Sequence, residues 1–516
     1  MPWDHPLYVM LGQLFLRVPL GEPAYRVNLM SALAGAGAVA MVYRIGVRLV
    51  RDRWAALLGA LALAVSHTFW FHAVTTEVYA LHALVMAGLI WLALRGADGR
   101  RTSDRRRFAL LAGIGLANHV MLVLTLLPTA SYLVAAGRAP GGGVGAATGG
   151  AAAPDDVTLP AGRAWVFVGS TAGWFLLGLA PWWVQFVRMA GLVGVPTAFE
   201  LASGLSWVPG LMFDQSASDL AANLGGYAAL LVYQFTPVGV ALGVGGARHL
   251  WRHRRRECAL LAALYVGHAA FSANYPVGDR FAFHLPSYVV FSLFITGGLA
   301  GLSRRLRVVG ARGRPRLERG VRNLLLAAML APVVAYAAAP PALRTLGRTE
   351  ASLGIPPIGT GARDGLAYFL DPNRRGDDAA ARFGRSALVA LPPGSLVFAA
   401  KPADTEAYLV LRYVQVAEGR RPDVRLEQLL FVPARDVPGT VLAAARAQAG
   451  CQPLYLASLN PTVYPLAALR ADFELVPEAN LYRLVPRYAP PAAACHDRAG
   501  GPVEGDLGQL IRSAMQ

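Results

Sequence analysis

Long apolar stretches follow one another through the first two thirds of the chain. A helix needs about 20 apolar residues to cross the hydrocarbon of a membrane. Windows of that length predict spans near residues 24–50, 54–74, 76–95, 164–187, 221–247, 258–275, 283–303 and 321–339. The pattern therefore predicts an α-helical integral membrane bundle.

One further apolar stretch, 108–136, is long for one crossing and short for two. Arginine-rich connections are expected in the cytoplasm, whereas the acidic loop 191–220 is expected outside, so this stretch must leave and return to the cytoplasmic side. It then forms a hairpin of two short helices with Asn118 and His119 near its tip, where non-helical backbone needs cover from protein or water. The alternative is a single tilted helix with His119 in the core.

The last third has a different pattern. Apolar β-like runs near 395–400, 424–431, 453–457 and 480–485 alternate with helical runs near 404–418 and 440–449. This alternation predicts an α/β domain with a mostly parallel sheet. We expect a membrane domain at 1–339, a flexible cytoplasmic linker at 137–163 and an extracytoplasmic α/β tail at 340–516. A docking or acceptor-recognition role and a purely structural role for the tail both stay open.

Composition supports the membrane assignment. Charged residues make up 15% of the chain, against roughly 25% in soluble domains. The net charge of +17 would suit nucleic acid, but the arginines cluster between apolar spans, where they act as topology signals. We therefore exclude nucleic acid as a partner and predict a multi-pass membrane protein with its C-terminal domain outside. Lys401 is the only lysine among 48 basic residues, and together with the abundant Ala and Gly this suggests a GC-rich bacterial genome, and so a bacterial inner membrane.

The three cysteines show no spacing typical of metal ligands. Cys451 and Cys495 both fall in the tail, where a disulfide would persist, and whether they pair stays open. Cys258 begins a span and is expected to be an inert apolar residue. No cofactor and no metal site are predicted, and a need for a divalent metal is left undecided.

Polar side chains gather on the predicted outer face, although ionisable groups beside spans are costly and usually mark a site or pathway. The set comprises Asp4, His5, Arg26, Asn28, His72, Glu77, Tyr79, His82, Asp279, Arg280, His284 and Tyr288.

Three of these residues have competing interpretations. Glu77 lies on a short connection and acts either as a general base or hydroxyl ligand, or as a carboxylate favoured by a helix N-terminus. Arg280 either holds a lipid phosphate or pairs with its neighbour Asp279. Arg26 is a second candidate for the phosphate, or an interfacial side chain whose charged end reaches water.

Several short runs, in order along the chain, resemble a known family. They are HPLY at 5–8, LGQLF at 11–15, VPLGEPAYRVNLMSAL at 18–33, TEVYAL at 76–81, GLANH at 115–119, DRFAFHLPSY at 279–288 and EGRRPDV at 418–424. These runs are similar to those of polytopic membrane glycosyltransferases of the GT-C superfamily, bacterial relatives of the eukaryotic transmembrane protein O-mannosyltransferases. The resemblance implies a GT-C-like bundle of about 8–10 spans plus a short-helix hairpin, followed by a soluble α/β domain.

The resemblance also implies an activity. A sugar would pass from a polyprenyl-phosphate donor to a protein hydroxyl or an envelope glycan at the outer face of the bilayer. We expect Glu77 and Asp4 to be catalytic. The expected substrate-binding residues are Arg26, Asn28, Tyr79, His119, Asp279, Arg280 and Tyr288. The alternatives are a transporter or flippase of lipid-linked envelope precursors and a non-catalytic membrane scaffold; internal repeats typical of transporters are not evident.

The chain departs from the family pattern at its start. In the family, a first span and an acidic pair of the form Asp-Ser-x-Glu precede an HPxGYPLY-type run. Here Met1 stands four residues before His5, and Asp4 is the remaining carboxylate. We expect the reading frame to begin upstream and to add one span; the alternative is a shortened, inactive form.

Overall fold

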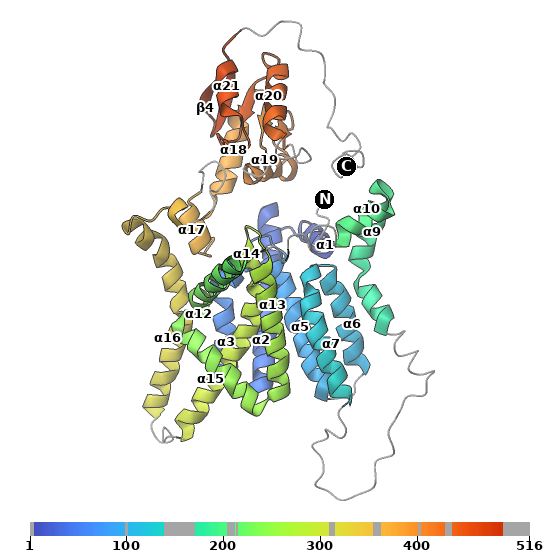
Figure 1. Cartoon of the computed structure of the whole chain (residues 1–516), viewed down its shortest axis with the longest axis vertical. Helices are drawn as coiled ribbons and strands as arrows, with labels where there is room; N and C mark the ends of the chain where they lie inside the picture. Colours follow the sequence, from blue (N-terminus) through green and yellow to red (C-terminus); the bar gives the residue numbers. More distant parts are fainter. Residues whose placement is uncertain are drawn as a thin grey trace, which may run out of the picture. The chain divides into compact units, whose positions relative to one another are not determined.

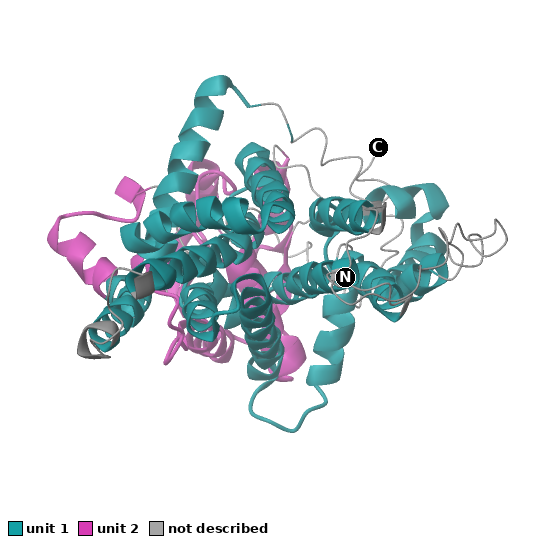
Figure 2. Cartoon of the chain, turned by 90° about the horizontal axis from the view of Figure 1, so that it is seen from below, with its two compact units in different colours: residues 1–337 teal, residues 338–516 magenta. Residues whose placement is uncertain are grey.

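The computed structural model describes residues 5–98, 102–138, 171–203, 212, 215–308, 315–353, 355, 363–400, 404–428 and 436–488. It divides into two compact units, Met1–Ala337 and Ala338–Gln516 (Figure 2). Asp4, Cys495 and residues 139–163 of the expected linker lie outside the described residues.

Unit 1 is helical throughout its described part (Figure 1). Its elements are α1 (Pro6–Phe15), α2 (Pro23–Val50), α3 (Arg53–Ala64), α4 (His67–Ala73), α5 (Tyr79–Asp98), α6 (Thr102–Leu116), η1 (Val120–Leu122), α7 (Val123–Arg138), α9 (Ala180–Val193), α10 (Val195–Ser203), α12 (Ala217–His253), α13 (Arg255–Asn274), α14 (Arg280–Phe283) and α15 (Leu285–Val308), with α16 (Pro315–Thr345) continuing into the next unit.

Five of the described helices are long and apolar enough to cross a membrane, namely α2, α5, α12, α15 and α16. The count rises to seven if each of two bent pairs, α3 with α4 and 171–178 with α9, forms one span. The prediction of a multi-pass helical membrane protein is confirmed, with fewer qualifying spans than the eight to ten expected. α13 occupies the predicted span 258–275 but begins with charged residues and is not among the five.

Burial distinguishes the helices of the bundle. In α15, 83% of the apolar window is buried, against 22% in α16. α15 packs on α12, α3, α13 and α2, so its apolar residues contact protein, whereas most of the apolar window of α16 is not buried within the described structure. Leu285, Val289 and Leu293, all fully buried, lie on this central helix.

The predicted hairpin at 108–136 is confirmed. α6 ends at Leu116, and His119 begins a 3-10 turn that leads into α7. α6 and α7 both pack against α5. The alternative of one tilted helix is wrong, because Asn118 and His119 occupy the break between two helices.

Two helices break where they meet inside unit 1. α3 and α4 meet at an angle of 69°, and α12 is interrupted at Thr236, whose φ is 62°. Gln234 accepts from the backbone N–H of Thr68 at 2.9 Å and donates to its hydroxyl at 2.8 Å. The hydroxyl of Tyr336 accepts from the backbone N–H of His67 at 3.0 Å. A broken helix leaves backbone N–H groups without a partner in the helix, and an apolar interior requires that they be hydrogen-bonded. These bonds supply the partners for His67 and Thr68.

Unit 2 contains a five-stranded sheet in the order β2 (Arg425–Glu427), β1 (Leu396–Phe398), β3 (Leu454–Leu456), β5 (Leu481–Pro486) and β4 (Phe473–Glu478). β1 pairs in parallel with β2 and β3, and β5 pairs antiparallel with β3 and β4. The predicted α/β domain is confirmed, but the mostly parallel sheet is wrong. β4 and β5 form a hairpin whose two turn residues, Ala479 and Asn480, have φ of 56° and 61°, as two-residue hairpin turns require.

Helices cover both faces of this sheet. α18 (Ala379–Ala390) and α19 (Thr405–Ala417) pack on the face to which the strand residues Val397 and Tyr455 point. α20 (Val437–Gln448) and α21 (Leu466–Asp472) pack on the other, where Phe398 and Leu456 point. Before α18, the described residues form the short helices η2 (Ala351–Leu353) and α17 (Gly365–Leu370).

The described cysteines differ in state. Cys258 is free and buried in α13, as expected for an apolar residue. Cys451 is disulfide-bonded, and Cys495, whose pairing with it the sequence leaves open, lies outside the described residues.

Candidate functional site

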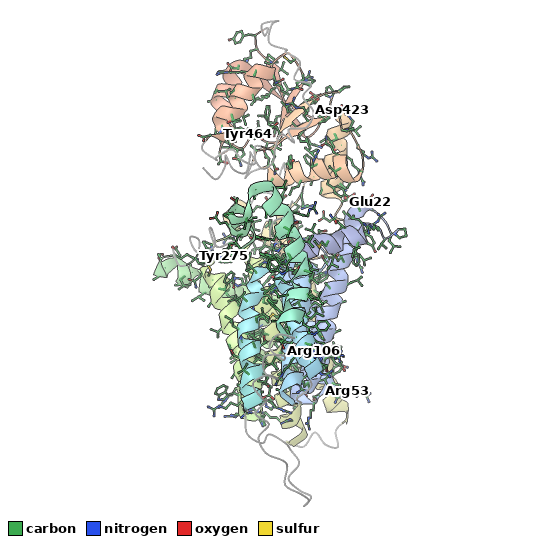
Figure 3. The ribbon with its side chains drawn as sticks, turned by 90° about the vertical axis from the view of Figure 1, so that its right-hand side faces the viewer. Glu22, Arg53, Arg106, Tyr275, Asp423 and Tyr464 are labelled. Carbon is green, nitrogen blue, oxygen red and sulfur yellow. The ribbon has the colours of Figure 1, made fainter. Side chains whose placement is uncertain are left out.

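One end of unit 1 carries most of the predicted site residues. The start of α2, the connection between α4 and α5, the tip of the α6–η1 hairpin and the segment before α15 all lie at this end. In Figure 3, Glu22 and Tyr275 mark this end of the bundle, whereas Arg53 and Arg106 lie toward the other. We call the group formed by Glu77, Tyr79, His119, Asp279 and Arg280 the polar mouth.

Glu77 and Tyr79 share a neighbour in Asp279. The Tyr79 hydroxyl donates to Asp279 Oδ2 at 3.5 Å. Surrounding protein, and after it the charge of Asp279, raise the pKa of the Glu77 carboxyl to about 7. Glu77 nevertheless keeps an exposed surface. A carboxylate that is reachable and titrates near neutrality meets the two requirements of a general base.

Hydrogen bonds join the connection that carries Glu77 to α2, and Ser31 of α2 in turn contacts α1. Thr76 Oγ1 donates a hydrogen bond to Asn28 Oδ1. Ser31 Oγ donates to the backbone oxygen of Glu77 at 3.5 Å and lies 2.9 Å from the Tyr8 hydroxyl. Burial raises the pKa of Tyr8 to about 12, so its hydroxyl keeps its proton. Asn28 therefore positions the backbone beside Glu77 through Thr76.

Hydrogen bonds also hold the tip of the hairpin formed by α6 and α7. His5 Nδ1 lies 2.7 Å from the backbone oxygen of Asn118, and Asn118 Nδ2 donates to the backbone oxygen of Val78 at 3.3 Å. His119 Nδ1 accepts from the backbone N–H of Met121 at 3.1 Å, which leaves the proton of the neutral ring on Nε2. Burial, followed by the nearby His82 and His5, holds the pKa of His119 well below its usual value. His119 is thus a neutral capping residue at the polar mouth.

Arg280 does not pair with its sequence neighbour. Its Nε donates to the backbone oxygen of Tyr275 at 3.0 Å, and Nη1 donates to Asn223 Oδ1. Among the described residues, Arg280 forms no ion pair with Asp279, and its Nη2 has no hydrogen-bond partner. These two hydrogen bonds orient the guanidinium, and the two N–H groups of Nη2 remain for a ligand. Sequence reasoning missed Asn223, although an amide at the start of the apolar stretch 221–247 was a usable signal.

The remaining predicted residues lie elsewhere or have other partners. Arg26 donates to the backbone oxygens of Leu16 at 2.7 Å, Leu20 at 3.0 Å and Gly21 at 2.9 Å. Tyr288 is fully buried in α15, where its ring stacks on that of Tyr227 at 6.0 Å. The binding roles assigned to both stay predictions.

Buried histidines lie beside the polar mouth. The ring of His119 lies 4.9 Å from His5 and 5.5 Å from His82, and His82 lies 6.4 Å from His268. Sequence reasoning missed His268, which faces the Thr125 hydroxyl at 3.0 Å. Within the described part of the chain, no group of three or more His, Cys, Asp or Glu side chains could hold a metal ion.

The N-terminal part of the chain, which contains Glu77, is similar in sequence to known proteins. Residues 4–139 match the family model for the N-terminal domain of the protein O-mannosyl-transferase TMEM260. The chain is 29% identical over 131 residues to TMEM260 of Mus musculus and 27% identical over 149 residues to tmem260 of Dictyostelium discoideum. These alignments cover 24% and 26% of this chain, and 19% and 18% of the relatives. The chain thus spans about a fifth of the length of the curated relatives it matches.

Solved structures show a likeness across nearly the whole chain. ArnT from Cupriavidus metallidurans, in the apo state and bound to undecaprenyl phosphate, aligns with TM-scores of 0.53 and 0.54 at 14% identity. The alignments cover 94% and 93% of this chain and 87% of ArnT. This likeness confirms the predicted fold, a GT-C-like membrane bundle with a C-terminal α/β domain. Together with the family match, it confirms the resemblance to GT-C membrane O-mannosyltransferases.

Proposed function

We propose that this chain is a membrane glycosyltransferase that moves a sugar from a polyprenyl-phosphate donor to a hydroxyl of a protein or envelope glycan. The observation that carries the proposal is Glu77, an exposed carboxylate with a pKa of about 7 at the polar mouth. Glu77 lies inside residues 4–139, the part similar to the O-mannosyl-transferase family. The solved ArnT structure with undecaprenyl phosphate supports a lipid phosphate as the donor.

In the proposed reaction, Glu77 takes the proton of the acceptor hydroxyl as its oxygen attacks the anomeric carbon. The bond between that carbon and the phosphate oxygen breaks, and its electron pair leaves with the polyprenyl phosphate, so the anomeric configuration inverts. Arg280, held by Asn223 and the Tyr275 carbonyl, offsets the charge that develops on the leaving phosphate. The polyprenyl tail stays in the bilayer of a bacterial inner membrane, with the mouth at its outer face.

Substitution of Glu77 tests this role. Glu77→Gln removes the base while keeping the size of the side chain, and we expect transfer from a polyprenyl-phosphate sugar to fall at least 100-fold in isolated membranes. Glu22→Gln, the same change at an exposed position of the same end of unit 1, should leave transfer within twofold. Equal rates in wild type and Glu77→Gln would remove Glu77 from the reaction.

The pH dependence supplies an independent check. A base must be ionised to act, so with a pKa of about 7 the transfer rate should rise with pH through 7 and level off above it. Because the folded-state pKa exceeds the usual 4.5, ionisation of Glu77 should also lower the stability of the fold as pH rises from about 4.5 to 7, and Glu77→Gln should remove that contribution. A rate that is flat between pH 5.5 and 8 would contradict the assignment.

A transporter of lipid-linked precursors is the second candidate. Broken helices near the middle of a bundle are typical of transporters, and α3–α4 and α12 both break beside Gln234. Reconstituted vesicles separate the two functions. Movement of a fluorescent polyprenyl-phosphate sugar across the bilayer without loss of its sugar would favour transport, whereas release of polyprenyl phosphate with glycosylation of an acceptor would favour transfer.

A further inference from the structure

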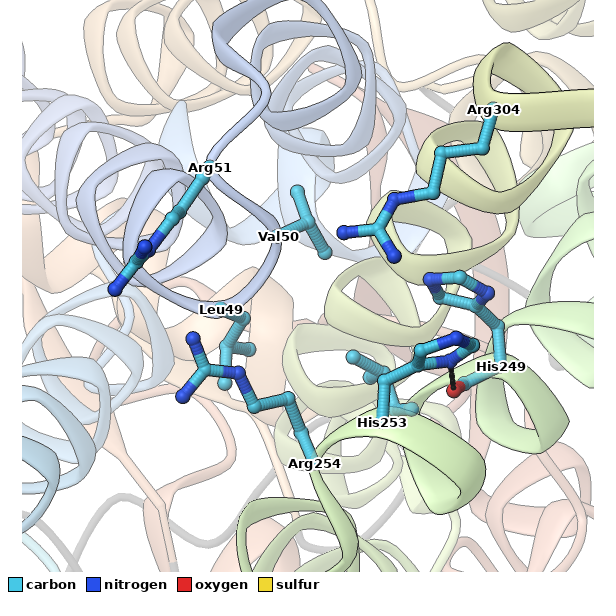
Figure 4. A pocket seen from close by; sticks show the side chains of 8 residues that line it. Leu49, Val50, Arg51, His249, His253, Arg254 and Arg304 are labelled. Atoms are coloured by element: carbon cyan, nitrogen blue, oxygen red, sulfur yellow. Dashed lines mark hydrogen bonds between the residues drawn. The ribbon is translucent and has the colours of Figure 1, made fainter. Parts of the chain in front are cut away.

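A second polar site lies at the end of unit 1 opposite the polar mouth. A small pocket with a volume of about 40 Å³, bordered by the ends of α2, α12 and α15, is drawn in Figure 4. Five basic side chains line it, and we call this group the basic pocket: Arg51, His249, His253, Arg254 and Arg304. The rest of the lining is apolar and buried, with Leu49, Val50 and Leu250.

The basic pocket is far from the polar mouth. α2 runs between them, and its 28 residues rise about 42 Å at about 1.5 Å per residue. Figure 3 shows Arg53, two residues after the pocket residue Arg51, at the opposite end of the bundle from Glu22. The two sites therefore cannot hold parts of one small substrate.

The pocket concentrates positive charge without an acidic side chain in its lining. Arg254 forms an ion pair with Glu257 at 3.6 Å. The side chains of Arg51 and Arg304 form no hydrogen bond or ion pair with any residue that the structure describes. Basic side chains at helix C-termini are favoured by the helix dipole, and they also set membrane topology. Neither effect explains why these arginines line the same pocket.

Tight helix packing fixes the walls of the pocket. α12 and α15 approach so closely that a Cβ added at Gly246 would overlap the backbone oxygen of Phe294, and one added at Gly298 would overlap that of Leu242. At Gly301 an added Cβ would lie 3.1 Å from His249 Nδ1. Figure 4 shows Arg304 and the rings of His249 and His253 facing the same space beside Val50. The backbone contacts between α12 and α15 thus hold Arg304 beside the rings of His249 and His253.

We propose that the basic pocket binds the phosphate of an anionic molecule at the level of the lipid headgroups. The planar guanidinium fork matches phosphate oxygens, and basic pockets between spanning helices on the cytoplasmic side bind anionic headgroups. The arginine-rich end of unit 1 is the end that the sequence predicts to face the cytoplasm. A phospholipid headgroup and a soluble phosphate both have this chemistry, and the buried leucine and valine side chains would contact the acyl chain of the lipid.

Native mass spectrometry of the full chain in mild detergent tests the proposal. The purified chain is titrated with dioleoyl phosphatidylglycerol, with dioleoyl phosphatidylcholine and with inorganic phosphate. We expect one phosphatidylglycerol per chain to bind at least tenfold more tightly than phosphatidylcholine. The double variant Arg51→Gln/Arg304→Gln should lose at least tenfold of that affinity.

A matched control removes the same charge nearby. Arg248 and Arg252 are exposed on the last two turns of α12 and do not line the pocket. Arg248→Gln/Arg252→Gln should bind phosphatidylglycerol within threefold of wild type. An equal loss in both double variants would show binding to net charge alone and overturn the proposal.

The titrations also separate the two sources of phosphate. Displacement of phosphatidylglycerol by millimolar inorganic phosphate, lost in Arg51→Gln/Arg304→Gln, would support the same pocket with a soluble phosphate as its ligand. Retention of the lipid in the presence of phosphate would support the headgroup. Absence of preferential binding by wild type to either probe would overturn the proposal, and because binding is read without turnover, this outcome would leave the proposed transferase activity untouched.

Discussion

At the scale of single residues, the outer end of unit 1 has side chains that bind neighbouring groups of the protein and others, in the polar mouth, that can still bind a ligand. Asn28, His119 and Arg26 use their hydrogen-bonding atoms on neighbouring hydroxyl or backbone groups. Glu77 keeps an exposed surface, and Arg280 keeps one amino group. The first group positions the second, which is the arrangement that a preorganised site requires.

Arg26 illustrates the positioning role. Its three hydrogen bonds hold the turn between α1 and α2, and Arg26→Ala would remove all three. Because the bonds are solvent-exposed, we expect a loss of about 1–2 kcal/mol in local stability. Hydrogen exchange at the amides of 16–22 should become faster. Arg17→Ala, at an exposed arginine on the same turn, should leave that exchange unchanged. Unchanged exchange in Arg26→Ala with a loss of donor binding would instead support a phosphate ligand.

The sequence predicted part of this site. Glu77, Tyr79 and Asp279 were expected at one face because short connections hold them beside spans, and the structure brings them together. The partner of Arg26 was not predictable, because it depends on how the turn at 16–21 folds back on α2. Tyr288 follows a polar run in sequence but enters the central helix α15 within one turn, so its ring is buried.

At the scale of elements, the contact between α12 and α15 depends on glycine. A side chain at Gly246 would meet the backbone of α15, whereas one at the adjacent Gly245 would meet nothing within 4 Å. Small residues at such positions let membrane helices approach closely. This contact also holds the walls of the basic pocket.

Two substitutions separate packing from helix propensity. Gly246→Ala should destabilise the protein by about 1–3 kcal/mol, because backbone must move to make room. Gly245→Ala should be neutral or stabilise by up to about 1 kcal/mol, because alanine favours a helix. Thermal unfolding of the two purified variants in the same detergent gives the comparison. Equal melting temperatures would show that α12 and α15 pack less closely than described.

The sequence predicted the helices correctly where one apolar stretch forms one helix. It failed where residues distant in sequence change the local structure through hydrogen bonds or strand pairing. The window at 54–74 indicates a single span, but α3 and α4 bend at Ser66 because Gln234 and Tyr336 satisfy the freed backbone. β4 was missed because it contains Pro477. An edge strand tolerates proline, and only the assembled sheet shows that β4 is at its edge.

At the scale of the whole molecule, charge is distributed unevenly along unit 1. Arg48, Arg51, Arg248, Arg252 and Arg304 lie near one end of α2, α12 and α15, and the polar mouth lies at the other. Lys and Arg favour the cytoplasmic side of a membrane. From this asymmetry we propose that the basic pocket faces the cytoplasm and the polar mouth faces outward. The extracytoplasmic tail at 340–516 stays a prediction from the sequence.

Cysteine labelling tests that orientation. In a Cys258→Ser background, Val389→Cys places an exposed thiol on α18 of unit 2, and Arg252→Cys places one at the basic end of α12. A membrane-impermeant maleimide added to intact spheroplasts should label the thiol at position 389, because the positive-inside bias retains the arginine-rich end in the cytoplasm. The thiol at position 252 should react only after lysis. The reverse pattern would place Glu77 on the cytoplasmic side, where an outward-facing transfer reaction is impossible.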